Sequence, residues 1–192
     1  MIYLASQSPR RQELLSQLAV EFDVIEVNVH EQQLAGELPW DYVNRVAKEK
    51  AGAGLLQLAG QSEAIVLGAD TDVVLAGLVL GKPENAEQAF AMLKSLSGKS
   101  HEVITAVWLM SAGQEQHCVL SSTVQFADLH DNEIHEYIDS GEPFGKAGGY
   151  AIQGRAAAFI ASIQGSYSGI MGLPLFETYQ LLKRFHVPVW RR

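Results

Sequence analysis

The side chains best suited to chemistry lie near the start of the chain, where Arg10 and Arg11 follow the segment Ser6-Gln7-Ser8-Pro9. Serine followed by proline is typical of a helix start, and we expect Ser8 to be the N-cap residue. Hydroxyls, guanidinium groups and free backbone N–H groups at one strand-to-helix junction could hold a polyphosphate. The same residues could instead cap a helix at a solvated surface, and composition alone favours neither interpretation.

Two carboxylates are candidates for holding a metal ion or a water molecule. Asp70 follows the apolar segment 64–67, so we expect it just beyond the end of a strand, where open α/β sheets place their ligands. There it could bind a hard divalent cation or orient a water for attack, although turn aspartates are far commoner than catalytic ones. Glu31 follows another predicted strand and is the second candidate; the alternative is a solvated loop acid.

Four further side chains are of types that could take part in chemistry: two lysines, one histidine and the single cysteine. Lys50 and Lys82 could neutralise phosphate oxygens, or could simply be solvated. We expect His101 to be a strand-edge residue bonded to backbone, because no second histidine stands at the spacing of a zinc site. Cys118 is predicted to be a small core residue.

A glycine-rich segment at 140–154 combines Glu142, Lys146, an aromatic ring and the amide of Gln153. Its glycines permit backbone conformations closed to other residues, as a ligand-recognition loop requires. A flexible connection is the alternative, but a loop this long in a compact domain is more often functional. The standard phosphate-loop, dinucleotide and serine-nucleophile motifs are absent from the sequence.

Length and composition restrict the class of protein. The 192 residues, 47% hydrophobic and 19% charged, contain no repeat or linker, which predicts a single domain over 1–192. The net charge of −8 argues against nucleic-acid binding, and no apolar run approaches the roughly 20 residues of a membrane span. One cysteine and no signal-like start predict a cytoplasmic protein.

Hydrophobic periodicity predicts strands and helices that mix without strict alternation, hence an α/β fold with a mixed sheet and a cleft between two lobes. The helix at 40–58 is expected to carry Lys48 and Lys50 on its polar face. The expected strands are 2–5, 21–29, 64–67, 73–75 paired with 78–80 in a hairpin, 101–110, 119–126 and 156–163. Helices are expected from Pro9 onward and at 40–58, 85–96, 131–139 and 174–185.

Taken together, these segments resemble the Maf family of nucleoside triphosphate pyrophosphatases along nearly the whole chain. Any one segment would be weak, but seven in the same order are highly specific. They are LASQSPRRQELL (4–15), AKEKA (47–51), LGADT (67–71), GKP (81–83), SGKSHEVITAV (97–107), SGEPFGKAGGYAIQG (140–154) and GSYSGIMGLPL (165–175).

The resemblance implies an inosine-triphosphate-pyrophosphatase-like fold with the nucleotide in an interlobe cleft. It implies hydrolysis of a nucleoside triphosphate between the α and β phosphates with Mg²⁺ or Mn²⁺, no nucleic-acid or membrane partner, and a homodimer. Matching positions make Asp70 the proton acceptor and, with Glu31, a metal residue. Arg10, Thr71 and Gln153 match the specificity positions of the branch acting on dTTP and UTP, and Ser6, Arg11, Lys50 and Lys82 match the phosphate end.

Two positions depart from the family pattern. Gly145 stands where the loop usually carries an aspartate, which implies slower turnover or a compensating acid such as Glu142. Gly169 stands where many relatives have asparagine, but it is not among the residues expected to take part in the chemistry.

The prediction is a pyrophosphatase acting on dTTP, UTP and modified pyrimidine nucleotides. The alternative is a nucleotide-binding regulator that inhibits septum formation with little turnover, and the specificity positions argue against the branch acting on 7-methyl-GTP.

Overall fold

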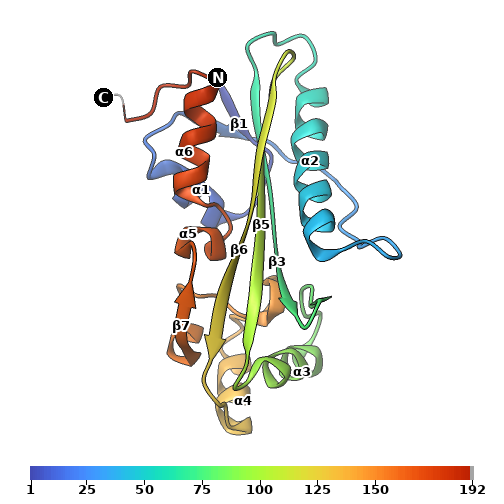
Figure 1. Cartoon of the computed structure of the whole chain (residues 1–192), viewed down its shortest axis with the longest axis vertical. Coiled ribbons are helices and arrows are strands. Elements are labelled where there is room, and N and C mark those ends of the chain that lie inside the picture. The colour runs from blue at the N-terminus through green and yellow to red at the C-terminus, as the bar shows by residue number, and fades with distance from the viewer. Residues whose placement is uncertain (191–192) are drawn as a thin grey trace. The chain divides into compact units, whose positions relative to one another are not determined.

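The computed structural model describes residues 1–190, and its strands form one mixed sheet of seven in this part of the chain (Figure 1). The sheet order is β2-β1-β3-β5-β6-β7, with β4 paired to β3. β1 is parallel to β2 and β3, whereas the β3–β4 and β6–β7 pairs are antiparallel, which confirms the predicted mixed α/β class. The strands are β1 (Ile2–Leu4), β2 (Phe22–Val24), β3 (Ile65–Leu75), β4 (Leu78–Val79), β5 (Ser100–Met110), β6 (Glu115–Phe126) and β7 (Ile160–Gln164).

Helices begin where the sequence supplies caps or prolines. Asn85 caps α3, its side chain accepting a hydrogen bond from the Gln88 N–H at 2.9 Å. Pro9 and Pro39 each stand in the first turn of a helix, where the missing N–H costs nothing. The α-helices are α1 (Pro9–Ser16), α2 (Pro39–Gln57), α3 (Ala86–Leu96), α4 (Asp131–Asp139), α5 (Tyr167–Met171) and α6 (Leu175–Arg184), and the 3₁₀ helices are η1 (Ala147–Gly149) and η2 (Arg155–Phe159).

The chain divides into two compact units, each with its own buried residues. Unit 1 contains residues 1–70, 105–120 and the segment from Gly172 onward. Unit 2 contains residues 71–104 and 121–171. The long strands β3, β5 and β6 contribute residues to both units.

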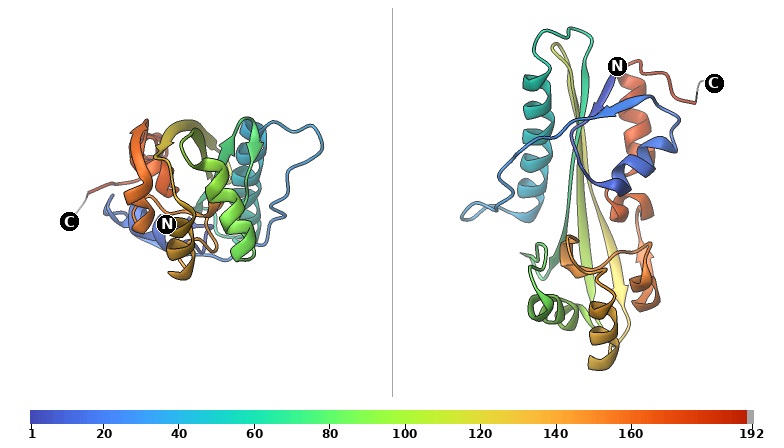
Figure 2. Two further views of the ribbon diagram at one scale, coloured as in Figure 1. Left: turned by 90° about the horizontal axis from the view of Figure 1, so that it is seen from below. Right: turned by 180° about the vertical axis from the view of Figure 1, so that it is seen from behind.

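In unit 1, α2 lies on one side of the long strands, and α1 and α6 lie on the other (Figures 1 and 2). The buried face of α2 is apolar, with Val43, Val46 and Ala47 fully buried. Gly68 lets this helix approach β3 closely, because a Cβ there would stand 2.5 Å from the Ala47 carbonyl oxygen and 2.5 Å from the Ala51 nitrogen. The missing side chain therefore decides how near α2 comes to β3.

In unit 2, α3 contacts α4 and η1. The buried ring of Phe126 on β6 contacts His101 on β5, Tyr150 and Phe159, with centroid distances of 5.1, 5.0 and 6.4 Å. This aromatic cluster packs the glycine-rich segment against the strands of its own unit.

Three expected strands differ from the structure, and one helix was not expected. The strand predicted at 64–67 continues through Gly68 to Leu75, because the packing of α2 against Gly68 outweighs the weak strand preference of glycine. Residues 155–159 form η2 before β7 instead of one strand from 156 to 163, and β2 spans only 22–24. Helix α5, only five residues long, was not expected because it is too short to show helical periodicity.

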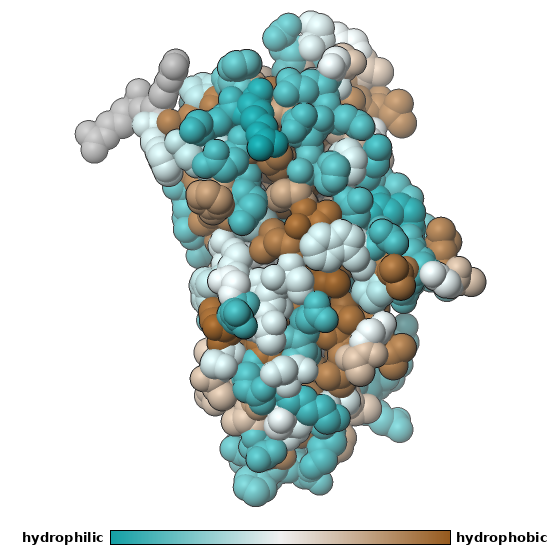
Figure 3. All heavy atoms as spheres, in the orientation of Figure 1, coloured by the Kyte–Doolittle hydropathy of each residue, from teal (hydrophilic) through white to brown (hydrophobic). Residues whose placement is uncertain are grey.

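On the face drawn in Figure 3, polar residues predominate and apolar residues lie among them. Leu34, Leu38 and Phe176 are among the exposed apolar residues of the chain. Isolated exposed apolar residues are normal on soluble domains. In residues 1–190, no helix is both long enough and apolar enough to cross a membrane.

Candidate active site

The centre of the candidate site in unit 1 is the ammonium group of Lys50, which lies between two carboxylates. Its Nζ is 2.6 Å from Glu31 Oε1 and 2.8 Å from Asp70 Oδ1. Lys50 and Asp70 are only 8% and 6% exposed. The expectation that Lys50 lies on a polar helix face is therefore wrong, because this side chain is buried against β3.

The local structure explains how these side chains meet. Strand side chains alternate between faces, so Asp70 projects from the same face of β3 as Gly68, toward α2. Lys50 directly precedes Ala51, which contacts β3 at Gly68. Asp70 lies within strand β3, whereas the sequence predicted it just beyond the end of a strand.

The parallel strands β1 and β2 bring two further segments toward the same place. Leu4 at the end of β1 pairs with Leu67 of β3 on one side and with Val24 of β2 on the other. Chain segments that leave parallel strands at their carboxyl ends emerge at one edge of the sheet. Ser6 follows β1 and Glu31 follows β2, which places both near Asp70.

Arg11 and Ser6 form the second part of the site. Arg11 donates from Nη1 to Ser6 Oγ at 3.2 Å and from Nε to the Gly172 carbonyl at 2.9 Å. The pKa of Arg11 is lowered overall, and burial is the largest cause. The nearby Asp70 and Glu31 carboxylates oppose this shift, and the charge of Arg10 adds to it. The guanidinium remains charged, as arginine does in proteins. Ser8 is the N-cap residue of α1 as expected, but its side chain makes no capping bond; its N–H donates to Ser6 Oγ at 3.3 Å.

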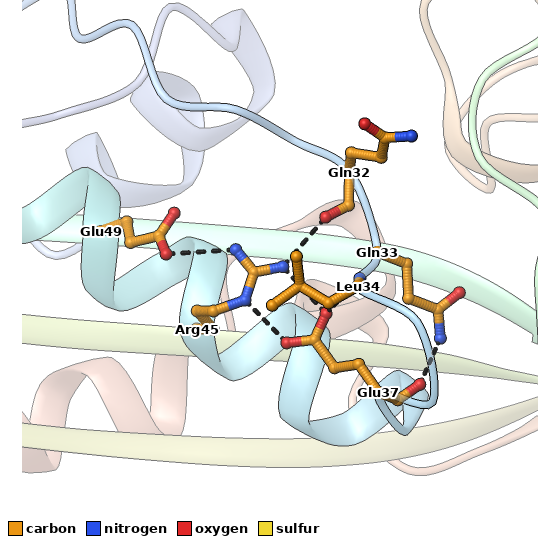
Figure 4. Close-up of polar contacts among 6 residues, drawn as sticks. All are labelled: Gln32, Gln33, Leu34, Glu37, Arg45 and Glu49. Atoms are coloured by element: carbon orange, nitrogen blue, oxygen red, sulfur yellow. Dashed lines mark hydrogen bonds and ion pairs between the residues drawn. The ribbon is translucent and has the colours of Figure 1, made fainter.

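Arg45 contacts Gln32 and Glu37, in the segment that directly follows Glu31, as Figure 4 shows. Its guanidinium donates from Nη2 to the Gln32 carbonyl at 3.0 Å and pairs with both Glu37 oxygens at 2.7 and 2.9 Å. A third contact joins Nη1 to Glu49 at 3.1 Å. The Glu37 hydrogen bond is the largest cause that raises the pKa of Arg45. Sequence reasoning missed Arg45, although its i,i+4 spacing to Glu49 is a signal for an ion pair.

The charges of this cluster suit an anionic ligand with a divalent cation. Arg10, Arg11 and Lys50 provide three positive charges and Glu31 and Asp70 two negative ones, which leaves one positive charge in a chain of net charge −8. The described residues contain no group of three or more Asp, Glu, His or Cys side chains that could enclose a metal ion. Two carboxylates fit the usual protein contribution to Mg²⁺, which takes its other ligands from phosphates and water.

The other three predicted site residues belong to unit 2. Thr71 follows Asp70 in β3, and its side chain therefore lies on the opposite face of that strand. Lys82 lies beside the glycine-rich loop, because the Gly148 N–H donates to the Gly81 carbonyl at 2.8 Å. Gln153 is exposed at the end of the same loop. The structure thus places Ser6, Arg10, Arg11, Glu31, Lys50 and Asp70 in unit 1, and ties Lys82 to the loop of Gln153 in unit 2.

Glu142 has a different role from the compensating acid that the sequence suggested. Its carboxylate accepts hydrogen bonds from the backbone N–H groups of Arg155 and Ala156 and from the Tyr137 hydroxyl. These donors occupy it within its own loop. Gly145 has a φ of +71°, with no atom within 4 Å of where a Cβ would stand, so an aspartate has space there but a strained backbone.

His101 bonds to a side chain instead of the backbone partner expected. Its Nε2 lies 2.7 Å from the Tyr150 hydroxyl, and Nδ1 is buried without a hydrogen-bond partner among the described residues. Burial lowers the pKa of His101 to about 4. Cys118 lies half-buried in β6, where burial raises the pKa of its thiol to about 12, consistent with an unreactive residue.

The mixed sheet and the cluster of Glu31 with the buried Lys50 and Asp70 define an α/β protein with a site suited to polyphosphate and a hard cation. A model of the family described as Maf-like protein matches residues 1–185. The chain belongs to this family.

Curated relatives match nearly the whole chain. A protein of Xanthomonas euvesicatoria pv. vesicatoria (strain 85-10), named dTTP/UTP pyrophosphatase, is 54% identical over 96% of this chain and 98% of its own. A protein of Xylella fastidiosa (strain 9a5c), named nucleoside triphosphate pyrophosphatase, is 52% identical over the same shares. Among solved structures, a Vibrio cholerae protein is 12% identical with a TM-score of 0.47, covering 97% of this chain and 98% of that one.

Proposed function

We propose that this protein hydrolyses dTTP and UTP to the nucleoside monophosphate and pyrophosphate. The observation that carries the proposal is the buried Lys50 ammonium, which lies between Glu31 and Asp70. Arg11 is close enough to both carboxylates for their charges to raise its pKa. The relative that is 54% identical over nearly the full length carries the name dTTP/UTP pyrophosphatase, which supports the substrate class. None of the relatives reported above carries a name that points to the septum-inhibiting alternative.

In this mechanism the cations of unit 1 bind the triphosphate. Arg11 is already oriented by Ser6 and the Gly172 carbonyl, so little ordering entropy is lost when its guanidinium binds phosphate oxygens. Lys50 can release part of its contact with the carboxylates to a phosphate oxygen, since its ammonium has three donors. We propose that Arg10 and Lys82 add positive charge along the same ligand.

Asp70 is the proposed general base. Its carboxylate is held in one orientation by Lys50, as positioning of a water for attack on the α phosphorus requires. Glu31 and Asp70 would hold the divalent cation, Mg²⁺ or Mn²⁺, which when bound offsets phosphate charge and lowers the pKa of water. The chain's own contribution is to orient the water at Asp70 and to keep Glu31 in place through the Arg45 contacts.

Base selection is proposed to depend on Gln153, with Thr71 and Arg10. Uracil and thymine present carbonyl acceptors flanking an N–H donor, and an amide supplies both the donor and the acceptor that match this edge. Sites that hydrogen-bond a substrate reject analogues that leave their polar groups unpaired. We also propose a homodimer, a cytoplasmic location and a housecleaning role in the nucleotide pool.

The test is pyrophosphate release from dTTP, UTP, CTP, GTP and 7-methyl-GTP with Mg²⁺ or Mn²⁺. We expect the highest kcat/KM for dTTP and UTP. Equal rates for all five nucleotides would refute the pyrimidine selectivity, and release of no pyrophosphate from any of them would refute the pyrophosphatase activity itself.

A further inference from the structure

The carboxylate of Glu142 closes the base of the loop that ends at Gln153. Oε2 accepts a hydrogen bond from the Arg155 N–H at 3.0 Å, and Oε1 accepts from the Ala156 N–H at 3.4 Å. The Tyr137 hydroxyl donates to Oε1 at 2.9 Å. One side chain thus joins the start of the loop to the residues that follow Gln153 and to helix α4.

Gly154, directly after Gln153, packs against this carboxylate. A Cβ at Gly154 would collide with the carboxyl carbon and both oxygens of Glu142. The Gly154 N–H also donates to the Ala151 carbonyl at 3.0 Å, which makes residues 151–154 a turn. The backbone on the C-terminal side of Gln153 is therefore held directly against Glu142.

The backbone on the N-terminal side of Gln153 is held by burial. Tyr150, Ala151 and Ile152 are all buried, and the Tyr150 hydroxyl bonds to His101 at 2.7 Å. The Gln153 side chain is exposed between these two fixed segments. The orientation of the Gln153 side chain therefore depends on the turn 151–154, whose backbone is fixed on both sides.

We propose that Glu142 is a positioning residue that sets base selectivity by fixing the turn that presents Gln153. This inference rests on the proposed function, because it assigns a cause to the pyrimidine selectivity. Hydrogen-bonded selection between bases needs the amide in one place and orientation, and a displacement of about 1 Å can cost on the order of 100-fold in rate.

The negative charge of Glu142 matters for this role. Burial would raise its pKa, but the hydrogen bonds from Arg155, Tyr137 and Ala156 together hold the pKa below its ordinary value. The group is therefore a carboxylate at neutral pH, and all three donors face an acceptor. A glutamine at this position turns an N–H group toward at least one backbone N–H. At least one of the hydrogen bonds from the Arg155 and Ala156 N–H groups is then lost.

The experiment compares the kcat/KM ratio of UTP to CTP in the full-length protein and its variants. We expect Glu142→Gln to lower this ratio about 10- to 100-fold, the range for the loss of one hydrogen bond to a charged group. Tyr137→Phe removes one donor and should lower the ratio less. Glu136→Gln removes the same charge from an exposed position on α4 and should leave the ratio unchanged.

A second arm separates positioning from a general effect on folding. In a Gln153→Ala background, Glu142→Gln should cause no further change in the ratio, because the side chain that it positions is gone. Hydrogen exchange of the Arg155 and Ala156 amides, measured without nucleotide, should be slow in the wild type and at least about tenfold faster in Glu142→Gln. If Glu142→Gln does not fold, Tyr137→Phe is measured in both backgrounds in its place.

The outcomes distinguish this inference from the proposed function. An unchanged ratio in folded Glu142→Gln, or an equal loss with and without Gln153, would overturn the positioning role. Fast exchange of both amides in the wild type would overturn it independently of activity. A wild type that releases no pyrophosphate refutes the proposed function instead, and the selectivity inference then fails with it even if the amides are protected.

Discussion

Replacement of Asp70 by asparagine tests the centre of the proposed mechanism. Asparagine has the same shape but is a neutral amide that cannot accept a proton from water near pH 7. The loss of a general base lowers turnover by about 10²- to 10⁴-fold, which corresponds to about 2.7–5.4 kcal/mol of transition-state stabilisation. We therefore expect kcat of Asp70→Asn for dTTP to fall by this factor, with nucleotide binding largely retained.

The structure also predicts the cost of this change to stability. Removing one partner of a buried ion pair costs about 3–5 kcal/mol when the other charge is left uncompensated. Lys50 keeps Glu31 at 2.6 Å, so its charge remains paired, and the asparagine oxygen can still accept from Nζ. We expect the free energy of unfolding to fall by less, about 1–3 kcal/mol.

The assay is pyrophosphate release under saturating dTTP, with urea unfolding of the same preparations. Asp72→Asn is the matched control, because Asp72 is equally buried on the same strand and its Oδ1 accepts from the Val73 N–H, which an amide oxygen can also do. The control should keep its turnover. Near-normal kcat in Asp70→Asn, or an equal loss in both variants, would remove Asp70 from the mechanism.

Four further predictions follow from single side chains. Gly145→Asp should fold at a backbone cost of about 1–2 kcal/mol and raise kcat, since the space for a Cβ is open; equal or lower kcat means that the loop is adapted to glycine. Gln153→Glu should lower kcat/KM for dTTP and UTP far more than it changes urea unfolding, and loss of stability without loss of selectivity would contradict its role. Arg45→Met should raise the Mn²⁺ concentration needed for half-maximal pyrophosphate release by freeing the segment of Glu31, with kcat retained at saturating Mn²⁺; an unchanged Mn²⁺ requirement would show that Glu31 is placed without Arg45. His101 is buried in its neutral form, with a pKa of about 4. The unfolded state therefore binds more protons as pH falls below about 6.5, and the free energy of unfolding drops by about 3 kcal/mol toward pH 4. In His101→Gln this part of the pH dependence of urea unfolding should disappear.

Local signals in the sequence were sufficient for many elements. Helix α4 spans 131–139 as expected, and Asn85 caps α3, because caps and periodicity act between residues a few positions apart. The hairpin turn at Ala76-Gly77 was also predicted correctly, and both residues have positive φ, as two-residue hairpin turns require. Seven short motifs in order were enough to predict the Maf family that the whole-chain match shows.

The contacts that make the candidate site were decided by tertiary structure. Lys50 and Asp70 are 20 residues apart, and their pairing depends on the missing side chain of Gly68, which brings α2 close to β3. Neither hydrophobic periodicity nor composition contains that packing distance. The sequence therefore made Asp70 and Lys50 separate candidates for the site, but did not predict that their side chains form a buried pair.

The same reason applies in unit 2. Glu142 meets the Arg155 N–H 13 residues later, and His101 meets Tyr150 49 residues later. The residue types showed which groups could donate or accept a hydrogen bond. Only the folded chain decided which of them are buried together, because the cost of leaving a polar group unpaired arises when packing excludes water from it.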